Sequence, residues 1–416
     1  MEMKKYKLGE IASFIGSGMT PLRSNENYWN SKDYPWLKTE QLGEYQIFDT
    51  NEYISKVALE ETNLKLFPQN TLSVAMYGEG KTRGNVSILA EQMTTNQACC
   101  NIIVDNKFAN YKFVYYWLKN SYYKLRSLSS GIRNNLNTED IKKFEINLPS
   151  LPTQQKIAAI LSSLDDKIAL NKKINAKLEA MAKRLYDYWF VQFDFPDKNG
   201  KPYKTSGGKM VWNEVLKREI PVGWEVGALS DIANITMGQS PEGSSYNENG
   251  RGTIFYQGST DFGIKFPTVR MFTTEPARFA QKGDILMSVR APVGAMNIAN
   301  TDCCIGRGLS AMNSKIGSIT YLYYIMDYFR HTFENKNGAG TTFGSITKDE
   351  LFELPVVIPD SNILKQFEFV VKPIFDKQMN IGFEIQKLTN LRDRLLPLLM
   401  NGQVEVEGNG YDRPAF

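Results

Sequence analysis

Histidine and cysteine are scarce in this chain of 416 residues, which contains one histidine and four cysteines. A single imidazole, at His331 in a predicted helix, gives no basis for histidine-based catalysis and excludes a histidine-rich metal site. The cysteines form two adjacent pairs, at residues 99–100 and 303–304, and this spacing fits neither a zinc site nor a disulfide framework. We expect them to be reduced, half-buried residues on strands of a cytoplasmic protein.

Long hydrophobic runs are also absent, and the balance of charge is weak. No stretch of about 18 apolar residues occurs, so no membrane-spanning helix is expected. The first residues lack the apolar core of a secretion signal, which again favours the cytoplasm. The net charge is +4, from 49 lysines and arginines against 45 aspartates and glutamates. Bulk charge therefore does not predict a nucleic-acid binder, and such a function would depend on local clusters or on a partner's charge.

Motifs of catalysis are missing as well. The sequence has no Walker A motif, no GxGxxG that opens a helix after a strand, and no GxSxG nucleophile elbow. It also lacks a tetrapeptide of the kind that amino-methyltransferases use to hold a flipped base. Glu79 and Lys81 lie in a glycine loop rather than on paired strands, so they make no convincing nuclease site. We predict a protein without a catalytic site and without a cofactor or metal of its own.

The region from residue 153 to residue 190 contains no proline or glycine and has apolar residues at spacings of three and four. This pattern is typical of a long helix with a near-heptad seam. Such a helix would span roughly 57 Å and would need a partner helix. Residues 361–402 repeat the pattern and predict that partner, although Pro373 suggests a kink or a late start. The residues expected at the helix interface are Ile157, Leu161, Leu164, Ile168, Asn171, Leu178 and Leu185 in the first helix and Ile374, Ile381, Leu388 and Leu395 in the second.

Two asparagines, Asn171 and Asn175, interrupt the apolar seam of the first helix. One interpretation is a boundary position wetted by solvent. The other is a polar lock that fixes the register of an antiparallel helix pair. The neighbouring charges at residues 165–166 and 172–173 predict a solvated helix face.

The chain is duplicated with an offset of about 210 residues, far beyond the period of a repeat array. Residues 113–116 (FVYY) match residues 321–324 (YLYY), and residues 136–141 (LNTEDI) match residues 346–351 (ITKDEL). We therefore predict an α+β fold in which two α/β globules of one design are separated by two long antiparallel coiled-coil helices. The expected boundaries are 1–152 and 213–360 for the globules, 153–190 and 361–402 for the helices, 191–212 for a connector and 403–416 for a tail.

Alternating apolar and polar residues predict a curled mixed sheet in the globules. The expected strands are residues 34–38, 46–48, 71–76, 86–89 and 98–104 in the first globule and residues 284–289 and 295–299 in the second. An aromatic helix is expected at residues 111–128, with a counterpart at residues 320–334.

Glycine-rich loops at matching positions of the two globules hold the candidate binding residues. Residues 78–84 lie between two predicted strands, and residues 288–294 are their counterpart in the second globule. Glycines allow close backbone approach, while arginine and lysine match the geometry of phosphates and guanine. Gln97 aligns with Arg307, and these side chains favour adenine and guanine respectively. Each loop taken alone also fits an ordinary solvated hairpin. The candidate DNA-binding residues are Lys81, Thr82, Arg83, Asn96, Gln97, Arg133, Asn134, Asn135, Arg290, Arg307, Thr341 and Thr342.

Several motifs give the chain a resemblance to a known family. They are residues 151–157 (LPTQQKI) ahead of the long helix, residues 189–196 (WFVQFDFP), residues 200–208 (GKPYKTSGG) with residues 212–214 (WNE), and residues 283–286 (GDIL). Together with the duplication, they make the whole chain resemble the specificity subunits of type I restriction-modification systems. The second helix departs mildly from the pattern, because Lys365 and Gln366 replace a Gln-Gln pair and Pro373 intrudes.

The resemblance implies a non-enzymatic subunit that recognises double-stranded DNA. Residues 1–152 and 213–360 would be target-recognition domains, each binding one half of a bipartite asymmetric site. The two long helices would set the distance between the half-sites and dock two methyltransferase subunits, which bind S-adenosylmethionine. Restriction subunits would add translocation and cleavage with ATP and Mg.

Two other functions stay open on the sequence. A duplicated scaffold whose globules bind protein instead of DNA agrees with the weak net charge, although the divergent loops with glycine, arginine and asparagine argue against it. A silent cassette that exchanges recognition domains without restriction is also compatible with the sequence.

Overall fold

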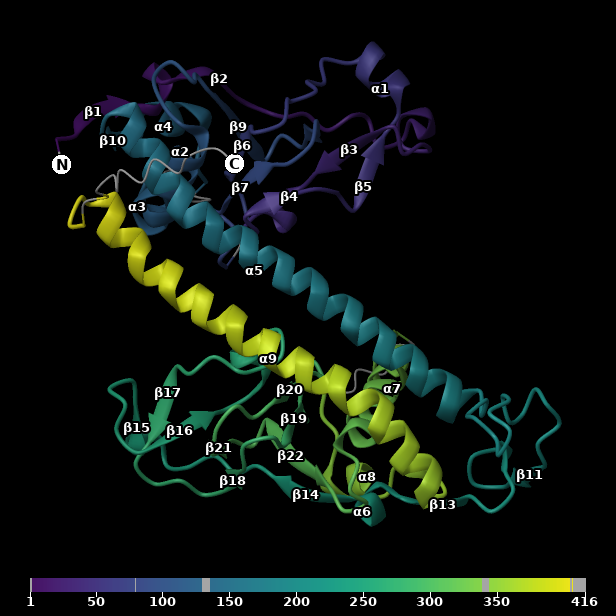
Figure 1. Ribbon diagram of the computed structural model, residues 1–416. Coiled ribbons are helices and arrows are strands. Elements are labelled where there is room, and N and C mark those ends of the chain that lie inside the picture. The colour runs from purple at the N-terminus through teal and green to yellow at the C-terminus, as the bar shows by residue number, and fades with distance from the viewer. Residues whose placement is uncertain (1, 79, 129–134, 339–343, 405, 407–416) are drawn as a thin grey trace, which may run out of the picture. The chain divides into compact units, whose positions relative to one another are not determined.

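A computed structural model describes residues 2–78, 80–128, 135–338, 344–404 and 406 of the chain (Figure 1). The chain divides into two compact units. The first consists of Met1–Ala169 and Lys387–Phe416, and the second of Leu170–Gln386. Each unit takes one part of each long helix, so segments far apart in the sequence fold together.

The first unit is built on two small sheets. The larger has the strand order β2-β9-β6-β7-β4 and is antiparallel except for the pair β4 and β7. The smaller has the order β5-β3-β8, in which β3 and β8 are parallel. A separate antiparallel pair joins β1 to β10. The strands are β1 (Lys4–Lys7), β2 (Ala12–Ser17), β3 (Tyr34–Leu37), β4 (Gln46–Ile47), β5 (Glu52–Ile54), β6 (Leu72–Ala75), β7 (Val86–Leu89), β8 (Thr94–Thr95), β9 (Cys99–Val104) and β10 (Glu145–Leu148).

The second unit has a four-stranded sheet of order β14-β22-β19-β20 and a five-stranded sheet of order β15-β17-β16-β21-β18. An antiparallel pair joins β13 to β23, and a hairpin pairs β11 with β12 across the expected end of the connector. The strands are β11 (Met210–Asn213), β12 (Arg218–Pro221), β13 (Glu225–Ala228), β14 (Ala233–Met237), β15 (Tyr246–Asn247), β16 (Thr253–Tyr256), β17 (Met271–Thr273), β18 (Phe279–Ala280), β19 (Ile285–Ser288), β20 (Met296–Ile298), β21 (Cys303–Ile305), β22 (Leu309–Ser314) and β23 (Pro355–Ile358).

The two units share one topology. The order β2-β9-β6-β7 of the first unit corresponds to β14-β22-β19-β20 of the second. The order β5-β3-β8 corresponds to β17-β16-β21, and both sets contain the same parallel pair. The closing pairs β1 with β10 and β13 with β23 also correspond. These matches confirm the predicted duplication and the mixed α/β fold of both globules.

The predicted helix at residues 111–128 is two helices in the structure. The chain breaks at Ser121, where Asn120 and Ser121 both have low helix propensity, although Leu125 of the second helix is buried in the same core as Leu118 of the first. Tyr123 in the second helix is 83% exposed. Besides the two long helices, the α-helices are α1 (Lys56–Glu61), α2 (Tyr111–Asn120), α3 (Tyr122–Ser127), α4 (Thr138–Lys143), α6 (Leu229–Ile232), α7 (Ile319–Gly338) and α8 (Lys348–Phe352). The 3-10 turns are η1 (Leu8–Glu10), η2 (Glu26–Tyr28), η3 (Thr39–Gln41), η5 (Gly243–Ser245) and η6 (Ser259–Asp261).

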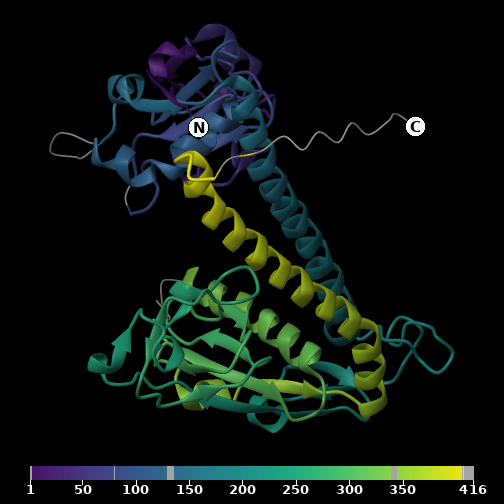
Figure 2. The same ribbon diagram turned by 60° about the vertical axis from the view of Figure 1, so that its left-hand side comes forward.

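The two long helices are α5 (Leu151–Tyr186), which continues into a π-turn at η4 (Asp187–Val191), and α9 (Ser361–Met400). Helix α9 begins at Ser361, as the predicted boundary has it, and runs through Pro373 as one helix. Of the two alternatives that Pro373 suggested, the late start is therefore wrong and the kink stays a prediction. Within each unit, Figures 1 and 2 show its segment of α5 beside its segment of α9.

Contacts within each unit show that the helices are antiparallel. In the first unit, Ile157 of α5 belongs to the same core as Leu396 and Leu399 of α9. In the second unit, the ring of Phe367 near the start of α9 lies 6.5 Å from that of Tyr186 at the end of α5. The early part of each helix therefore packs against the late part of the other.

The predicted interface residues divide into two groups by burial. Fully buried are Ile157, Leu161, Ile168, Asn171 and Ile381. Half-buried are Leu164, Leu178, Leu185, Ile374, Leu388 and Leu395. Residues beside the predicted seam, such as Ala158 and Ser162, are buried as well. The buried stripe is wider than the apolar seam because each helix also packs on a globule.

The interface between the helices includes a buried ion pair at Asp165, where the sequence predicts a solvated helix face. Asp165 is only 2% exposed, and its Oδ1 lies 2.6 Å from Nη1 of Arg392 on α9. The hydroxyl of Tyr116 donates to Oδ2 of Asp165 over 2.7 Å. Burial and the charge of Asp165 together raise the pKa of Tyr116 far above its usual range. An ion pair between the helices therefore replaces an apolar layer, and the expectation for Asp165 is wrong.

The asparagines of α5 are not wetted boundary residues. Asn171 and Asn175 are 2% and 3% exposed, and the amide of Asn175 has no hydrogen-bond partner among the described residues. The glutamine of the facing helix, Gln378, is fully buried. The register lock stays a prediction, and burial favours it over the solvated alternative.

All four cysteines are free thiols on β9 and β21 and are fully buried, not half-buried as expected. Burial raises the pKa of Cys100 to about 12, so this thiol stays protonated and unreactive. Over the part of the chain that the structure describes, no helix has the length and apolar content needed to cross a membrane.

The variant Arg392→Met should destabilise the protein by about 3–5 kcal/mol, because it leaves the Asp165 carboxylate buried without its cation. The free energy of unfolding in urea measures this loss. Arg394→Met changes an exposed arginine of the same helix and should cost less than about 0.5 kcal/mol. Equal stability of the two variants would contradict a structural role for the ion pair.

Candidate nucleic-acid interface

Three loops of the first unit meet at one end of β6 and β9. They are the loop between β6 and β7, the turn between β8 and β9, and the segment that leads into α4. The amide of Met76 donates to the carbonyl of Ala98 over 2.8 Å, and the amide of Leu136 donates to the carbonyl of Met76 over 3.1 Å. Loops that are distant in the sequence thus form one surface.

This surface holds the predicted residues of the first globule. Lys81 and Gln97 are exposed, while Thr82, Arg83, Asn96 and Asn135 are half-buried. Arg133 and Asn134 lie outside the described residues.

Helix α3 holds the backbone of the β6–β7 loop. Nη1 of Arg126 donates to the carbonyl of Arg83 over 2.9 Å, and its Nη2 donates to the carbonyl of Gly80 over 2.8 Å. The hydroxyl of Tyr122 donates to the carbonyl of Lys81 over 2.7 Å. Gly84 ends the loop with a φ of +86°, and a Cβ there would lie 2.9 Å from Cγ of Arg126. The loop is therefore fixed by its backbone, while the Lys81 side chain stays exposed.

The same three loops meet in the second unit. The amide of Val289 donates to the carbonyl of Gly308 over 2.9 Å, and the amide of Ile346 donates to the carbonyl of Val289 over 2.9 Å. Gly294 has a φ of +87° and takes the place of the glycine that ends the corresponding loop of the first unit. The loop that carries Arg290 is shorter than its counterpart, and its backbone pairs with Ser345.

Arg290 and Arg307 are exposed cations of this second surface. Ser288 supports the first of them, because its hydroxyl donates to the carbonyl of Arg290 over 2.7 Å. Thr341 and Thr342 lie outside the described residues.

Gln97 and Arg307 occupy equivalent positions. In the first unit the turn begins where the amide of Asn96 donates to the carbonyl of Leu37 over 2.9 Å. In the second unit the amide of Gly306 donates in the same way to the carbonyl of Tyr256 over 2.8 Å. The two turns thus have one backbone geometry and differ in the side chain that they expose.

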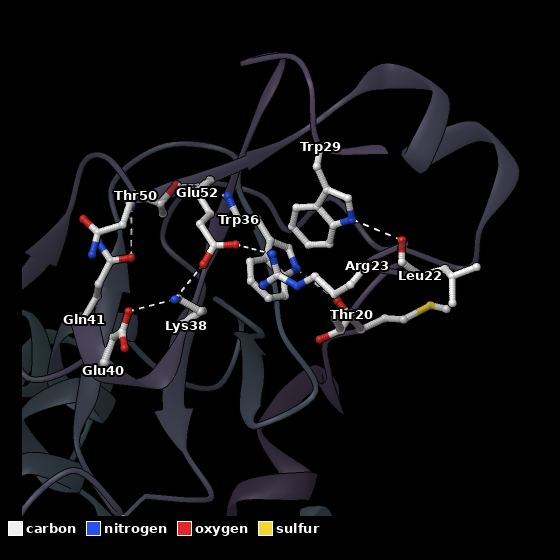
Figure 3. Close-up of polar contacts among 12 residues, drawn as sticks. Thr20, Leu22, Arg23, Trp29, Trp36, Lys38, Glu40, Gln41, Thr50 and Glu52 are labelled. Carbon is white, nitrogen blue, oxygen red and sulfur yellow. Dashed lines mark hydrogen bonds and ion pairs between the residues drawn. The ribbon is translucent and has the colours of Figure 1, made fainter. Parts of the chain in front are cut away.

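Sequence reasoning missed a group of residues that Figure 3 shows. The guanidinium of Arg23 lies 3.8 Å from the ring centre of Trp29 and 4.7 Å from that of Trp36. One arginine followed by two tryptophans within 14 residues was the available signal. Sequence alone gave no means of seeing that these residues converge next to Gln97.

Within the described residues, no group of three or more histidine, cysteine, aspartate or glutamate side chains could hold a metal ion. The candidate residues that the structure describes on these loops are cations, amides and hydroxyls. Side chains of these kinds contact phosphates and base edges.

A family model described as the type I restriction modification DNA specificity domain matches residues 1–180 and 221–379. The chain belongs to this family. Specificity subunits of type I restriction-modification systems are non-catalytic, and the cofactors are bound by the methyltransferase and restriction subunits.

Relatives and solved structures agree with this family. The type I restriction enzyme MjaIX specificity subunit of Methanocaldococcus jannaschii is 30% identical over 98% of this chain and 94% of that protein. The HindI specificity subunit of Haemophilus influenzae is 25% identical over 68% of this chain and 74% of that protein. The crystal structure of the type I restriction-modification S subunit from M. genitalium covers 96% of both chains with a TM-score of 0.59 and 18% identity, and it supports the fold alone.

The variant Arg126→Met should loosen the β6–β7 loop of this specificity subunit, because the loop loses the two hydrogen bonds that Arg126 donates to its carbonyls. Limited trypsin digestion should cleave after Lys81 several-fold faster than in the unchanged protein. Lys124→Met alters the same helix without touching the loop and should cleave at the original rate. If both variants were cut at that same rate, Arg126 would not hold the loop.

Proposed function

We propose that each globule of this specificity subunit recognises one half of a bipartite, asymmetric DNA site. The observation that carries the proposal is the pair of equivalent turns that expose Gln97 in one globule and Arg307 in the other. A duplicated scaffold that kept its backbone and changed its exposed side chains suits two modules with different targets. An adaptor that bound two copies of one partner would be expected to keep the same side chains.

The exposed residues match the donor and acceptor pattern of the major groove. A glutamine amide can both accept from and donate to the edge of adenine, and an arginine guanidinium can donate twice to guanine. Lys81 and Arg290 lie on the neighbouring loops, where a cation can contact a phosphate and fix the orientation of the duplex. In this proposal Gln97 and Arg307 choose the bases, and the other two residues position the backbone.

The paired helices are proposed to set the number of unspecified base pairs between the half-sites. Helix α5 has 36 residues, which correspond to about 54 Å. One turn of DNA measures about 34–36 Å, so a helix of this length can separate two recognition modules by more than a turn. The spacer would then depend on helix length instead of on any DNA contact.

The partners of this function are double-stranded DNA, two methyltransferase subunits and the restriction subunits. S-adenosylmethionine, ATP and Mg would be held by those subunits. The net charge of +4 is small for a protein that binds DNA alone. A complex with the methyltransferase subunits accounts for this small charge, because those subunits could supply much of the phosphate contact.

The variants Gln97→Ala and Arg307→Ala test the assignment of one reader to each half-site. In the complex with its methyltransferase subunits, each variant should lose about 1–3 kcal/mol of discrimination at base pairs of one half-site only. Binding to a panel of duplexes with single base-pair changes measures the loss. Equal weakening on all duplexes, with a shallower salt dependence, would instead mean a phosphate contact.

An insertion of four residues into each long helix tests the spacer. Four residues add about 6 Å and rotate the helix by roughly 40°, close to the rotation of one base pair. Placed after Ala169 in α5 and before Lys387 in α9, the insertions lengthen both helices by the same amount. The methylated site should keep both half-sites and gain one or two unspecified base pairs. An unchanged spacer would contradict the role of the helices.

A further inference from the structure

The amide of Gln97 is already engaged by a neighbour in the first globule. The hydroxyl of Thr20 donates a hydrogen bond to Oε1 of Gln97. Thr20 is half-buried and Gln97 is exposed, so the contact lies at the surface of the recognition turn. In the second globule the residue at the equivalent position, Ser240, acts differently, since its hydroxyl accepts from the backbone amide of Arg307 over 3.2 Å.

The segment that carries Thr20 is fixed from both sides by tryptophans (Figure 3). Nε1 of Trp36 donates to the carbonyl of Met19 over 3.0 Å. Nε1 of Trp29 donates to the carbonyl of Leu22 over 3.2 Å. The amide of Met19 donates in turn to the carbonyl of Thr95, at the end of β8. Thr20 is therefore held between two anchored neighbours and next to the turn that it touches.

Arg23 covers the two tryptophans, and its charge is balanced within the cluster. Its guanidinium forms an ion pair with Glu52, whose other oxygen lies 2.6 Å from Nζ of Lys38. Lys38 also lies 3.0 Å from Glu40, so two cations alternate with two anions. Burial opposes ionisation of Glu52, but the hydrogen bonds from Arg23 and Lys38 outweigh it and lower the pKa of this carboxyl. A cation neutralised in this way is better suited to holding protein segments than to binding a phosphate.

We propose that Thr20 is a positioning residue that holds the Gln97 amide in place for base recognition. A free glutamine side chain rotates about three bonds, and ordering it on a base costs conformational entropy. The bond from Thr20 restricts this motion before DNA binds, and in the structure it engages Oε1. The Nε2 group then offers its hydrogens to an acceptor on the base, and the second lone pair of Oε1 stays available for a donor.

The proposal rests on the proposed function, because Gln97 must contact a base for its position to matter. It names the edge that the first globule recognises, which is an acceptor beside a donor as on the major-groove side of adenine. It also gives a reason for the cluster of Arg23, Trp29 and Trp36, on a segment of the sequence that carries none of the predicted site residues.

The experiment uses the full chain in complex with its methyltransferase subunits and duplexes based on the methylated site found in host DNA. Each base pair of the site is changed in turn. Gln97→Ala should lower the preference at one base pair and so locate its contact. Thr20→Val removes the hydroxyl at constant volume and should lower the preference at that same base pair about tenfold. Thr20→Ser keeps the hydroxyl and should stay within about twofold of the unchanged protein.

Three results would overturn the proposal. Unchanged preference in Thr20→Val, beside a loss in Gln97→Ala, would refute the positioning role and leave Gln97 as a reader. An equal loss in Thr20→Ser and Thr20→Val would mean that packing matters and the hydroxyl does not. No loss in Gln97→Ala at any base pair would refute both the reader and its positioning residue.

Arg23→Met supplies a second measurement that does not depend on Thr20. It should lower the preference at the same base pair, because Trp29 and Trp36, which hold the Thr20 segment, lose their contact with the Arg23 guanidinium. It should leave the slope of log K against log salt unchanged. A slope that falls by about 0.9 would instead make Arg23 a phosphate contact and contradict the proposal.

Discussion

Each globule of this protein completes its hydrophobic core with residues from both long helices. In the first unit, Ile157 and Leu161 of α5 share a core with Leu396 and Leu399 of α9. In the second unit, Tyr186 shares a core with Phe367, Val371 and Phe375. The two globules therefore do not complete their cores independently of the helix pair. Helix pairing brings together segments about 200 residues apart and is a condition for either core to close.

Polar groups are buried in the helix interface. The buried pair of Asp165 and Arg392 adds little net stability over an apolar layer of the same size, because both charges must leave water. A shifted register would, however, leave one of these charges buried without its partner. If the predicted register lock holds, the buried amides of Asn171 and Asn175 act in the same sense. We interpret these residues as a means to choose one register out of several that the apolar seam would allow, which matters if helix length defines the DNA spacer.

The sequence predicted the architecture well because its signals are periodic and repeated. The apolar spacing from residue 153 to residue 190 anticipated α5, and the matches at an offset of about 210 anticipated two globules of one topology. It placed Asp165 wrongly because a carboxylate on a helix normally faces solvent, and its partner, Arg392, is 227 residues away. It also expected one helix at residues 111–128, where the chain breaks at Ser121.

The candidate interface was predicted only in part. Glycine and arginine patterns located the loops, and the repeat aligned Gln97 with Arg307, which the backbone hydrogen bonds of the two turns support. Thr20 and the cluster around Arg23 were missed, because their approach to Gln97 depends on the pairing of strands and loops up to 77 residues apart. Such contacts leave no local pattern, so only the folded chain reveals them.

The central claim is that this one chain carries two separate readers of DNA. The most direct test is to sequence adenine methylation in cells that express the methyltransferase subunits of the system with and without this chain. The account predicts a motif of two unlike half-sites, separated by a fixed number of unspecified base pairs, that disappears when the chain is absent. A single contiguous motif, or methylation that does not depend on the chain, would contradict it.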